Sequence, residues 1–184
     1  MGRVGLRRMG GGDLEEFVGL AVESVELHAG RVYTPVTPEG FEEYLGRFGG
    51  GEAEAFLIRR GGEGGAVGLV TISGIVRGPY QRGVLGYAGF ASGVGKGYVT
   101  EGVGLAVRYG FGRLGLHRLE ADVEPDNVAS LRLVERLGFR REGYSPGFIQ
   151  LDGRWRDYER WAITPEISGG LGTCEDWQLP DTGF

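Results

Sequence analysis

The sequence predicts an α+β domain built around one mixed β-sheet. The apolar residues follow strand and helix periods in the order strand, two helices, three strands, helix, strand, helix and hairpin. A glycine-rich loop joins the last of the three strands to the helix that follows it. The pair Asp152-Gly153 near the end of this order is typical of a tight type I′ hairpin turn. Together these features favour a single sheet with both parallel and antiparallel strands.

The composition is that of a globular protein with one domain. The chain has 184 residues, of which 41% are hydrophobic and 24% are charged. The net charge of −5 argues against a general nucleic-acid surface, and no apolar run approaches the roughly 18 residues of a membrane span. The single cysteine, Cys174, excludes an internal disulfide, and the N-terminus lacks a signal-peptide core. We therefore expect a cytoplasmic protein without nucleic-acid or membrane partners.

The first half of the chain predicts one strand, two helices and a three-stranded meander. Asp13 precedes the first helix, and Glu16 three residues later completes a capping-box pattern. Pro38 suits the first turn of the second helix. The expected ranges are a strand at 3–8, helices at 13–27 and from 37 or 38 to 48, and strands at 54–60, 66–76 and 82–91.

The second half predicts two helices, a strand between them and the final hairpin. Gly110 and Gly112 would each weaken the first of these helices by about 1 kcal/mol relative to alanine, so close backbone packing is expected there. Gly138 is placed to end the second helix. The face of that helix expected to point inward carries Ala129, Leu131, Val134 and Leu137. The expected ranges are 98–114, 118–124, 127–137, 139–151 and 154–163.

Residues 90–101, with the sequence FASGVGKGYVTE, predict a strand end, a glycine loop and the first turn of a helix. Glycines let the backbone approach a ligand closely, and the first N–H groups of a helix point at any bound anion. A pyrophosphate is the expected ligand. The Walker pattern fails because Gly97 follows Lys96, and the dinucleotide pattern fails on glycine spacing. The alternative is an ordinary turn in a chain with 38 glycines.

Five short stretches follow one another in order: 97–102 (GYVTEG), 115–121 (GLHRLEA), 125–130 (PDNVAS), 137–139 (LGF) and 152–157 (DGRWRD). These stretches and the order of elements resemble the GNAT superfamily of N-acetyltransferases, and in particular its Rim-type branch, named for enzymes that acetylate the N-terminus of ribosomal proteins. The resemblance covers roughly residues 3–164, so we expect a GNAT acetyltransferase domain at 1–164. Residues 165–184 are expected to form a tail that is either disordered or docked on a partner subunit.

The resemblance implies acetyl-CoA as co-substrate and no metal. Ser92 replaces the long polar residue usual in the family loop, with little effect expected because backbone N–H groups bind most of the phosphate. Thr100 would add a hydroxyl to a phosphate, Asn127 would hydrogen-bond the pantetheine arm, and Ser130 would lie near the thioester sulfur. The implied cofactor-binding residues are Phe90 and Ala91, through backbone groups facing the pantetheine, and Ser92, Gly93, Val94, Gly95, Lys96, Gly97, Tyr98, Thr100, Asn127 and Ser130.

Acetyl transfer to an amine needs a neutral amine, a polarised carbonyl and a stabilised thiolate. An α-amine, with a pKa of about 7.7–8.0, is already partly neutral at pH 7, whereas a lysine, at about 10.4, needs a base. A backbone N–H at the end of the strand before the loop would donate to the carbonyl oxygen. Ser130 is the candidate donor to the thiolate, because Val134 stands where many family members carry a tyrosine. A plain helix N-cap for Asn127 and a surface hydroxyl for Ser130 are the structural alternatives.

The general base is left open by the sequence. Glu120 and Glu26 are the candidates, and Glu120 is the predicted catalytic carboxylate, with a structural role as its alternative. Glu101 lies in the first turn of the loop helix, where a carboxylate suits the helix dipole and a structural role is favoured. His28 is expected to be a solvated cation at the end of the first helix. A water relay or a self-ionising amine is an equal alternative, and the lack of a clear base favours an α-amine over a lysine.

Three functions are compatible with these residues. The first is acetyl transfer to a protein N-terminal α-amine by direct attack in a ternary complex, without a covalent enzyme intermediate. The second is acetylation of a small amine such as an antibiotic or a polyamine, which the acidic Glu23 and Glu26 would suit. The third is a non-catalytic module that binds acyl-CoA. The expected partners are the amine substrate and a second copy of the chain in a homodimer.

Overall fold

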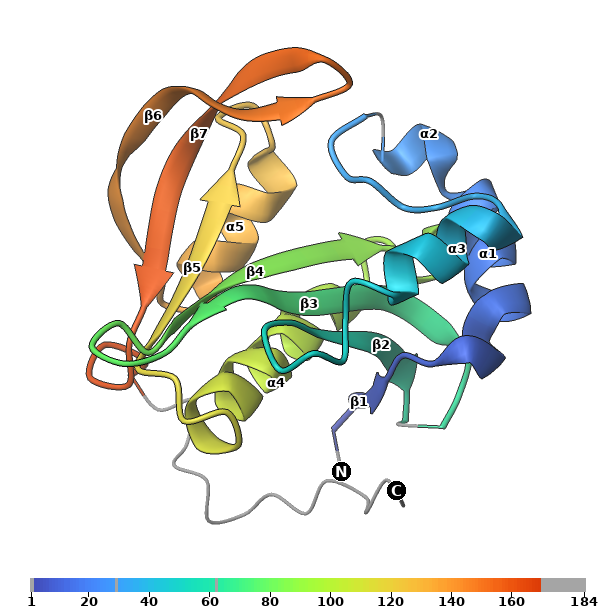
Figure 1. The fold of residues 1–184 in the computed structure, drawn as a ribbon, viewed down its shortest axis with the longest axis horizontal. Helices are drawn as coiled ribbons and strands as arrows, with labels where there is room; N and C mark the ends of the chain where they lie inside the picture. Colours follow the sequence, from blue (N-terminus) through green and yellow to red (C-terminus); the bar gives the residue numbers. More distant parts are fainter. Residues whose placement is uncertain (1, 29, 62, 170–184) are drawn as a thin grey trace.

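The computed structural model describes residues 2–28, 30–61 and 63–169, and it confirms the predicted order of elements. In this part of the chain the strands form one mixed sheet in the order β1-β2-β3-β4-β5-β7-β6. Figure 1 shows the sheet twisting across the molecule, with the β6–β7 hairpin at one end. The elements are β1 (Val4–Arg8), η1 (Gly11–Asp13), α1 (Leu14–Glu23), α2 (Val25–His28), α3 (Pro38–Leu45), β2 (Glu54–Arg60), β3 (Ala66–Val76), β4 (Arg82–Gly89), η2 (Ala91–Gly93), α4 (Tyr98–Gly112), β5 (Arg118–Val123), α5 (Val128–Arg136), β6 (Arg140–Leu151) and β7 (Arg154–Ile163).

Each face of the sheet carries its own core, because successive side chains of a strand point to opposite faces. On β2, Ile58 belongs to the core beneath α4 and α5, whereas Leu57 belongs to the core beneath α1 and α3. The first core includes Val103 and Val107 of α4. The second contains the buried aromatic rings Phe17, Phe41 and Phe90. The sheet is therefore covered by helices on both faces, as the apolar patterns require.

Strands β4 and β5 are the one adjacent parallel pair in the described sheet, and they stay paired only briefly. The pairing joins residues 82–84 of β4 with residues 118–120 of β5. Beyond that point the two strands diverge, and Figure 1 shows β4 and β5 running apart toward their C-terminal ends. The β6–β7 hairpin continues the sheet on the far side of β5. The backbone edge of β4 that faces away from β3 therefore lacks a neighbouring strand over its last residues.

The predicted first helix is divided at Ser24, and two details of its prediction are wrong. Ser24 is fully buried, and its hydroxyl donates to the backbone oxygen of Leu20 at 2.6 Å. Its backbone leaves the helical conformation, so the turn that follows is a separate helix, α2. Asp13 makes no side-chain cap to α1; its carboxylate accepts from the Gly10 N–H. Glu16 bonds the Ala66 N–H instead of completing a capping box.

Several finer predictions in the second half are confirmed and two need correction. A Cβ added at Gly110 would lie 2.8 Å from Leu119, which explains the glycine by close packing, whereas Gly112 is exposed. Gly138 takes a left-handed conformation at the end of α5, and Asp152 and Gly153 both have positive φ, as a type I′ turn requires. On α5, Ala129 is exposed and Leu133 is buried, so the inward face is rotated relative to the prediction.

The first residues of the predicted tail pack on the domain. Ile167 contacts the core beneath α4 and α5. Glu166 lies 2.9 Å from Nε2 of His117, and both side chains are exposed. Residues 170–184, with the rest of the predicted tail, lie outside the described residues. The boundary at residue 164 stays a prediction.

Candidate active site

The predicted glycine loop forms a strand–loop–helix unit between β4 and α4. Gly95 and Gly97 both have positive φ, near 75°, which side chains with a Cβ rarely adopt. Gly97 is the N-cap of α4, and the first helical hydrogen bond runs from the Glu101 N–H to the Gly97 oxygen. The three N–H groups before it, at residues 98–100, have no partner inside the helix. They form the positive end of a 15-residue helix, which suits a diphosphate.

The loop is held in place by contacts from distant segments. Gly93 lies so close to β3 that an added Cβ would be 2.7 Å from the Val67 oxygen. The Arg3 guanidinium, from the start of the chain, donates to the Lys96 oxygen at 3.1 Å and to the Glu101 carboxylate at 2.7 Å. Glu101 therefore forms an ion pair with Arg3, in agreement with the structural role favoured for it. Contacts within the protein therefore fix the shape of the loop.

The remaining loop residues lie around these glycines. The Lys96 ammonium donates to the Ser92 oxygen at 3.1 Å, and the Ser92 hydroxyl donates to the Ala66 oxygen at 3.3 Å. Val94 is exposed, and Thr100 is partly buried in the first turn of α4. The Arg3 guanidinium lies over the Tyr98 ring, and its Cζ is 5.4 Å from the ring centroid. All the predicted loop residues thus gather at one end of α4.

The backbone groups of Phe90 do not face the opening between β4 and β5, contrary to the prediction. The Phe90 N–H donates to the Val67 oxygen at 2.9 Å, and its oxygen accepts from the Gly93 N–H. The Ala91 N–H donates to the Ser24 hydroxyl at 3.0 Å. Because backbone groups alternate along a strand, those of Tyr87 and Gly89 point toward the opening instead. Sequence alone missed this because pairing with β3 decides which residues face outward.

Asn127 and Ser130 lie together at the start of α5. The Asn127 side-chain oxygen accepts from the Ser130 N–H at 3.2 Å, which is the N-cap geometry. The Ser130 hydroxyl lies 2.6 Å from the hydroxyl of Tyr87, on β4. Burial raises the pKa of Tyr87 to about 12, so this phenol keeps its proton at neutral pH. A tyrosine therefore stands beside Ser130 after all, reaching it from β4, while Val134 is buried in the core.

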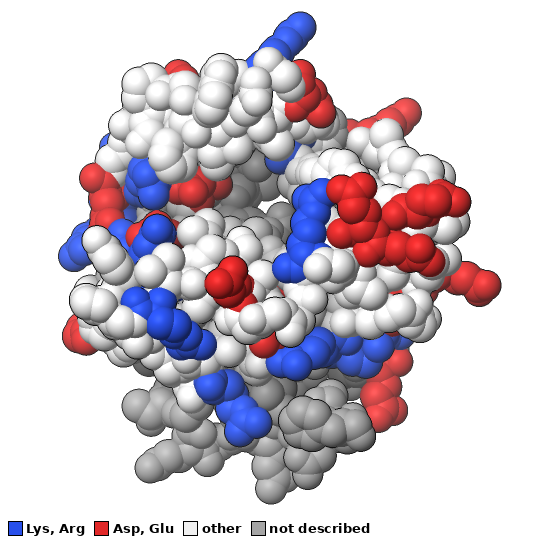
Figure 2. Space-filling model, in the orientation of Figure 1, with Lys and Arg blue, Asp and Glu red and all other residues white. Residues whose placement is uncertain are grey.

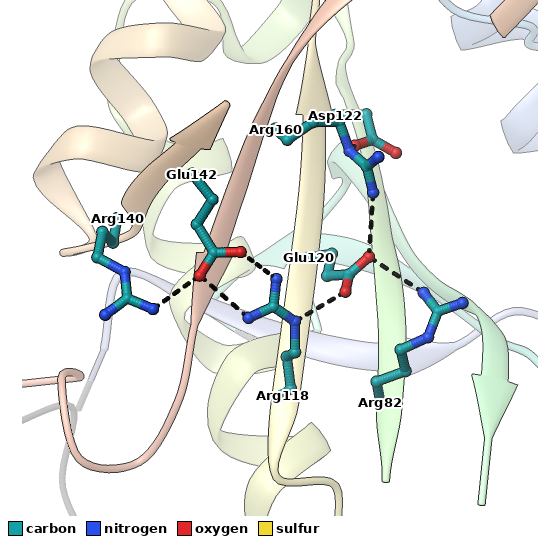
Figure 3. Close-up of polar contacts among 7 residues, drawn as sticks. All are labelled: Arg82, Arg118, Glu120, Asp122, Arg140, Glu142 and Arg160. Carbon is teal, nitrogen blue, oxygen red and sulfur yellow. Dashed lines mark hydrogen bonds and ion pairs between the residues drawn. The ribbon is translucent and has the colours of Figure 1, made fainter. Parts of the chain in front are cut away.

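Glu120 lies on β5 within a network of arginines (Figure 3). Its side chain is buried, with 7% of the residue exposed. Its two oxygens contact Arg118 at 2.7 Å, Arg82 at 3.1 Å and Arg160 at 3.4 Å. These residues come from β4, β5 and β7, so the carboxylate ties three strands together where β4 and β5 begin to diverge. Its assignment as the catalytic base stays a prediction. The three arginine contacts argue against that role, because they already engage both carboxylate oxygens.

His28 is buried against the end of β4 and is not the solvated cation predicted from its place in the helix. Its Nε2 lies 2.9 Å from the Gly89 oxygen, and its Nδ1 lies 2.9 Å from the hydroxyl of Thr34. The division of the first helix at Ser24 turns α2 so that its last residue faces the sheet. Glu26, the other candidate base, is exposed.

A cleft opens between the α2–α3 segment and the turn of the β6–β7 hairpin. Figure 2 shows this face of the molecule hollowed between the hairpin end and the helical side. The cleft has a volume of about 320 Å³. It is lined by Gly30, Val32, Tyr33, Thr34, Arg47, Gln150, Leu151 and Asp152. Three segments distant in sequence therefore build its wall, with one guanidinium and one carboxylate among them.

The comparisons with known proteins identify the family. The model of the acetyltransferase (GNAT) domain matches residues 3–140, and the chain belongs to this family. It is 37% identical to the probable N-acetyltransferase YjcK of Bacillus subtilis over 121 residues, covering 66% of this chain and 67% of the relative. It is 34% identical to the ribosomal protein uS5-alanine N-acetyltransferase of Escherichia coli over 131 residues, covering 69% and 68%. The protein is thus an acetyltransferase of the RimJ-like branch.

A solved structure agrees with this assignment. The RimJ of Mycobacterium smegmatis, determined in complex with CoA-disulfide, superposes with a TM-score of 0.79 at 26% identity. The match covers 89% of this chain and 82% of that chain. Among the described residues, no group of His, Cys, Asp and Glu side chains could hold a metal ion, and no helix there is long and apolar enough to cross a membrane.

Proposed function

We propose that the protein transfers an acetyl group from acetyl-CoA to a primary amine, by direct attack in a ternary complex, and that the amine is a protein N-terminal α-amine. The observation that carries this proposal is the glycine loop at the start of α4, joined to the free edge of β4. The loop would hold the diphosphate of CoA through the N–H groups at residues 98–100. The backbone groups of Tyr87 and the N–H of Gly89, whose oxygen is held by His28, would hydrogen-bond the pantetheine arm along that edge.

The Tyr87–Ser130 pair would stabilise the departing thiolate. As the amine nitrogen bonds to the carbonyl carbon, the carbon–sulfur bond breaks and negative charge moves to sulfur. Hydrogen bonds to charged groups are worth about 1.5–3 kcal/mol. A phenol with a pKa of about 12 donates a hydrogen bond to a thiolate without losing its proton to it. The proton that ends on sulfur would instead come from the attacking nitrogen.

The cleft between the α2–α3 segment and the β6–β7 turn would admit the amine, and its charge balance supports an α-amine over a polyamine. A polyamine carries several positive charges, and its binding would favour several carboxylates in the cleft wall. The wall holds one carboxylate, that of Asp152, and one guanidinium, that of Arg47. Glu23 and Glu26 are exposed and are not part of the lining. The likeness to an enzyme named for acetylating a ribosomal-protein alanine supports the same choice.

The test is CoA release, followed with a thiol reagent, from acetyl-CoA and a panel of amines. The panel comprises ribosomal-protein N-terminal peptides, polyamines and aminoglycosides. Turnover restricted to peptides is the expected result. Turnover on small amines alone would replace the proposed substrate class. Acetyl-CoA binding without any turnover would instead indicate an acyl-CoA-binding module. The homodimer stays a prediction, which light scattering would check.

A pair of glycine variants tests the cofactor site. Gly95 and Gly115 both have positive φ and open space around an added Cβ, so alanine costs similar backbone strain at each. Gly95 lies in the loop before α4, whereas Gly115 follows the other end of that helix. Gly95→Ala is expected to raise the KM for acetyl-CoA at least several-fold, and Gly115→Ala to leave it unchanged. Equal KM values in both variants would remove the loop from the cofactor site.

A further inference from the structure

His28 is a buried titratable side chain that the chemistry above leaves without a role. Its Nε2 lies 2.9 Å from the Gly89 oxygen. A carbonyl oxygen only accepts hydrogen bonds, so Nε2 carries a proton in every state that keeps this contact. The nitrogen that can gain or lose a proton is therefore Nδ1. It faces the Thr34 hydroxyl at 2.9 Å, and a hydroxyl can both donate and accept.

Gly89 places the imidazole at the opening between β4 and β5. The Phe90 N–H bonds Val67 on β3, so the Gly89 oxygen, one residue earlier, points away from β3. On that side β5 has already diverged, because its pairing with β4 ends at Val84. The His28 ring thus lies at the end of the strand edge assigned above to the acyl donor.

Thr34 connects this ring to the cleft. It is a lining residue of the cleft and the hydrogen-bond partner of Nδ1 at the same time. The charged side chains of the cleft wall are Arg47 and Asp152. The Arg47 guanidinium lies over the rings of Tyr33 and Tyr44, 5.5 and 5.9 Å from their centroids. Among the described residues, the hydrogen bonds of the His28 ring go only to Thr34 and Gly89.

We propose that Thr34 and His28 form the proton relay that deprotonates the attacking amine. This inference rests on the proposed function and supplies the base that it lacks. One ammonium proton passes to the Thr34 oxygen as the hydroxyl proton passes to Nδ1 of His28, which becomes imidazolium. An imidazole can accept a proton on one nitrogen while the other keeps its hydrogen bond, which suits this task. The neutral amine then forms the nitrogen–carbon bond. A second proton ends on the CoA sulfur, the third stays on the amide, and the imidazolium returns its proton through Thr34 to solvent.

The experiment compares Thr34→Val, Thr34→Ser and His28→Gln with the wild-type enzyme on a peptide α-amine. General base catalysis contributes about 10²–10⁴-fold, so Thr34→Val and His28→Gln are expected to lower kcat/KM for the amine about 100-fold at pH 6.5. Without the relay only the neutral amine reacts, so their kcat/KM should rise about tenfold per pH unit up to the amine pKa of about 8. The wild-type profile should be flatter, and the difference between the profiles should shrink to a few-fold near pH 9. Thr34→Ser keeps the hydroxyl and should retain most of the activity.

The readouts separate a relay from a structural role. The affinity for acetyl-CoA, measured by titration, should be unchanged in Thr34→Val, and thermal unfolding reports whether each variant folds. Equal pH profiles for Thr34→Val and the wild type would overturn the relay while leaving the proposed function intact. A pH-independent loss, shared by Thr34→Ser, would also overturn it. Absence of wild-type turnover on every amine would overturn the proposed function, and the relay with it.

Discussion

The two faces of the sheet are assigned different halves of the reaction, and they are built in different ways. On the α4 side, the diphosphate site consists of backbone N–H groups and glycine conformations within one short segment, residues 93–100. On the other side, the cleft takes its wall from the α2–α3 segment, from Arg47 just after α3, and from the β6–β7 turn with the residues before it. The difference teaches that a site built from backbone N–H groups needs few particular side chains. A site for the acceptor amine depends instead on which side chains the fold brings together.

The largest expected effect comes from Tyr87 and Ser130, which lie between the proposed cofactor site and the cleft. Tyr87→Phe and Ser130→Ala should each lower kcat about 10- to 100-fold, because a hydrogen bond to the thiolate is worth about 1.5–3 kcal/mol. Steady-state kinetics with acetyl-CoA and the preferred amine would measure this, and the KM for acetyl-CoA should change little. If Tyr87→Phe keeps full kcat, the 2.6 Å contact between the hydroxyls is structural.

A smaller effect is expected from Asn127, and a second helix cap provides its control. The Asn127 side chain caps α5 through the Ser130 N–H, and the Thr37 side chain caps α3 through the Gly40 N–H. Replacing either residue with alanine should cost about 1 kcal/mol of unfolding free energy. Only Asn127→Ala should also raise the KM for acetyl-CoA, by several-fold. A KM that stays at the wild-type value would leave Asn127 as a cap alone.

The smallest effect concerns the charged network that joins β5 to the first residues of β6 (Figure 3). Hydrogen bonds from Arg118 and Arg140 lower the pKa of Glu142 from 4.5 to about 2. A lowered pKa contributes stability above about pH 4.5, which is lost as the pH falls toward 2. Glu142→Gln should therefore remove about 1 kcal/mol or less above pH 4.5, because the pair is partly exposed, and nothing once the pH is well below 2.

Denaturant unfolding of the wild type and Glu142→Gln at several pH values would measure this difference. If the difference in unfolding free energy between the two proteins does not become smaller at acidic pH, the ion pair adds no pH-dependent stability.

Much of the fold could be predicted because its signals are local. The strands β2, β3 and β7 begin and end where the alternating pattern predicts. The errors arise where distant contacts override local preference. Ser24 breaks the first helix because its buried hydroxyl bonds both Leu20 and the Ala91 N–H. Glu16 leaves the capping-box position because Arg59 and Ala66 on the sheet bind its carboxylate.

The sequence by itself determined the glycine loop and the helix after it, because these depend on backbone conformations encoded within a few neighbouring residues. The class of enzyme came from the resemblance of five short stretches to the GNAT superfamily. Tertiary structure alone decided that Tyr87 meets Ser130 and that His28 lies between Gly89 and Thr34. It also decided that Glu120 is enclosed by arginines. The physical reason is that strand pairing and the divergence of β4 from β5 set which groups face the opening, and no short stretch of sequence specifies that geometry.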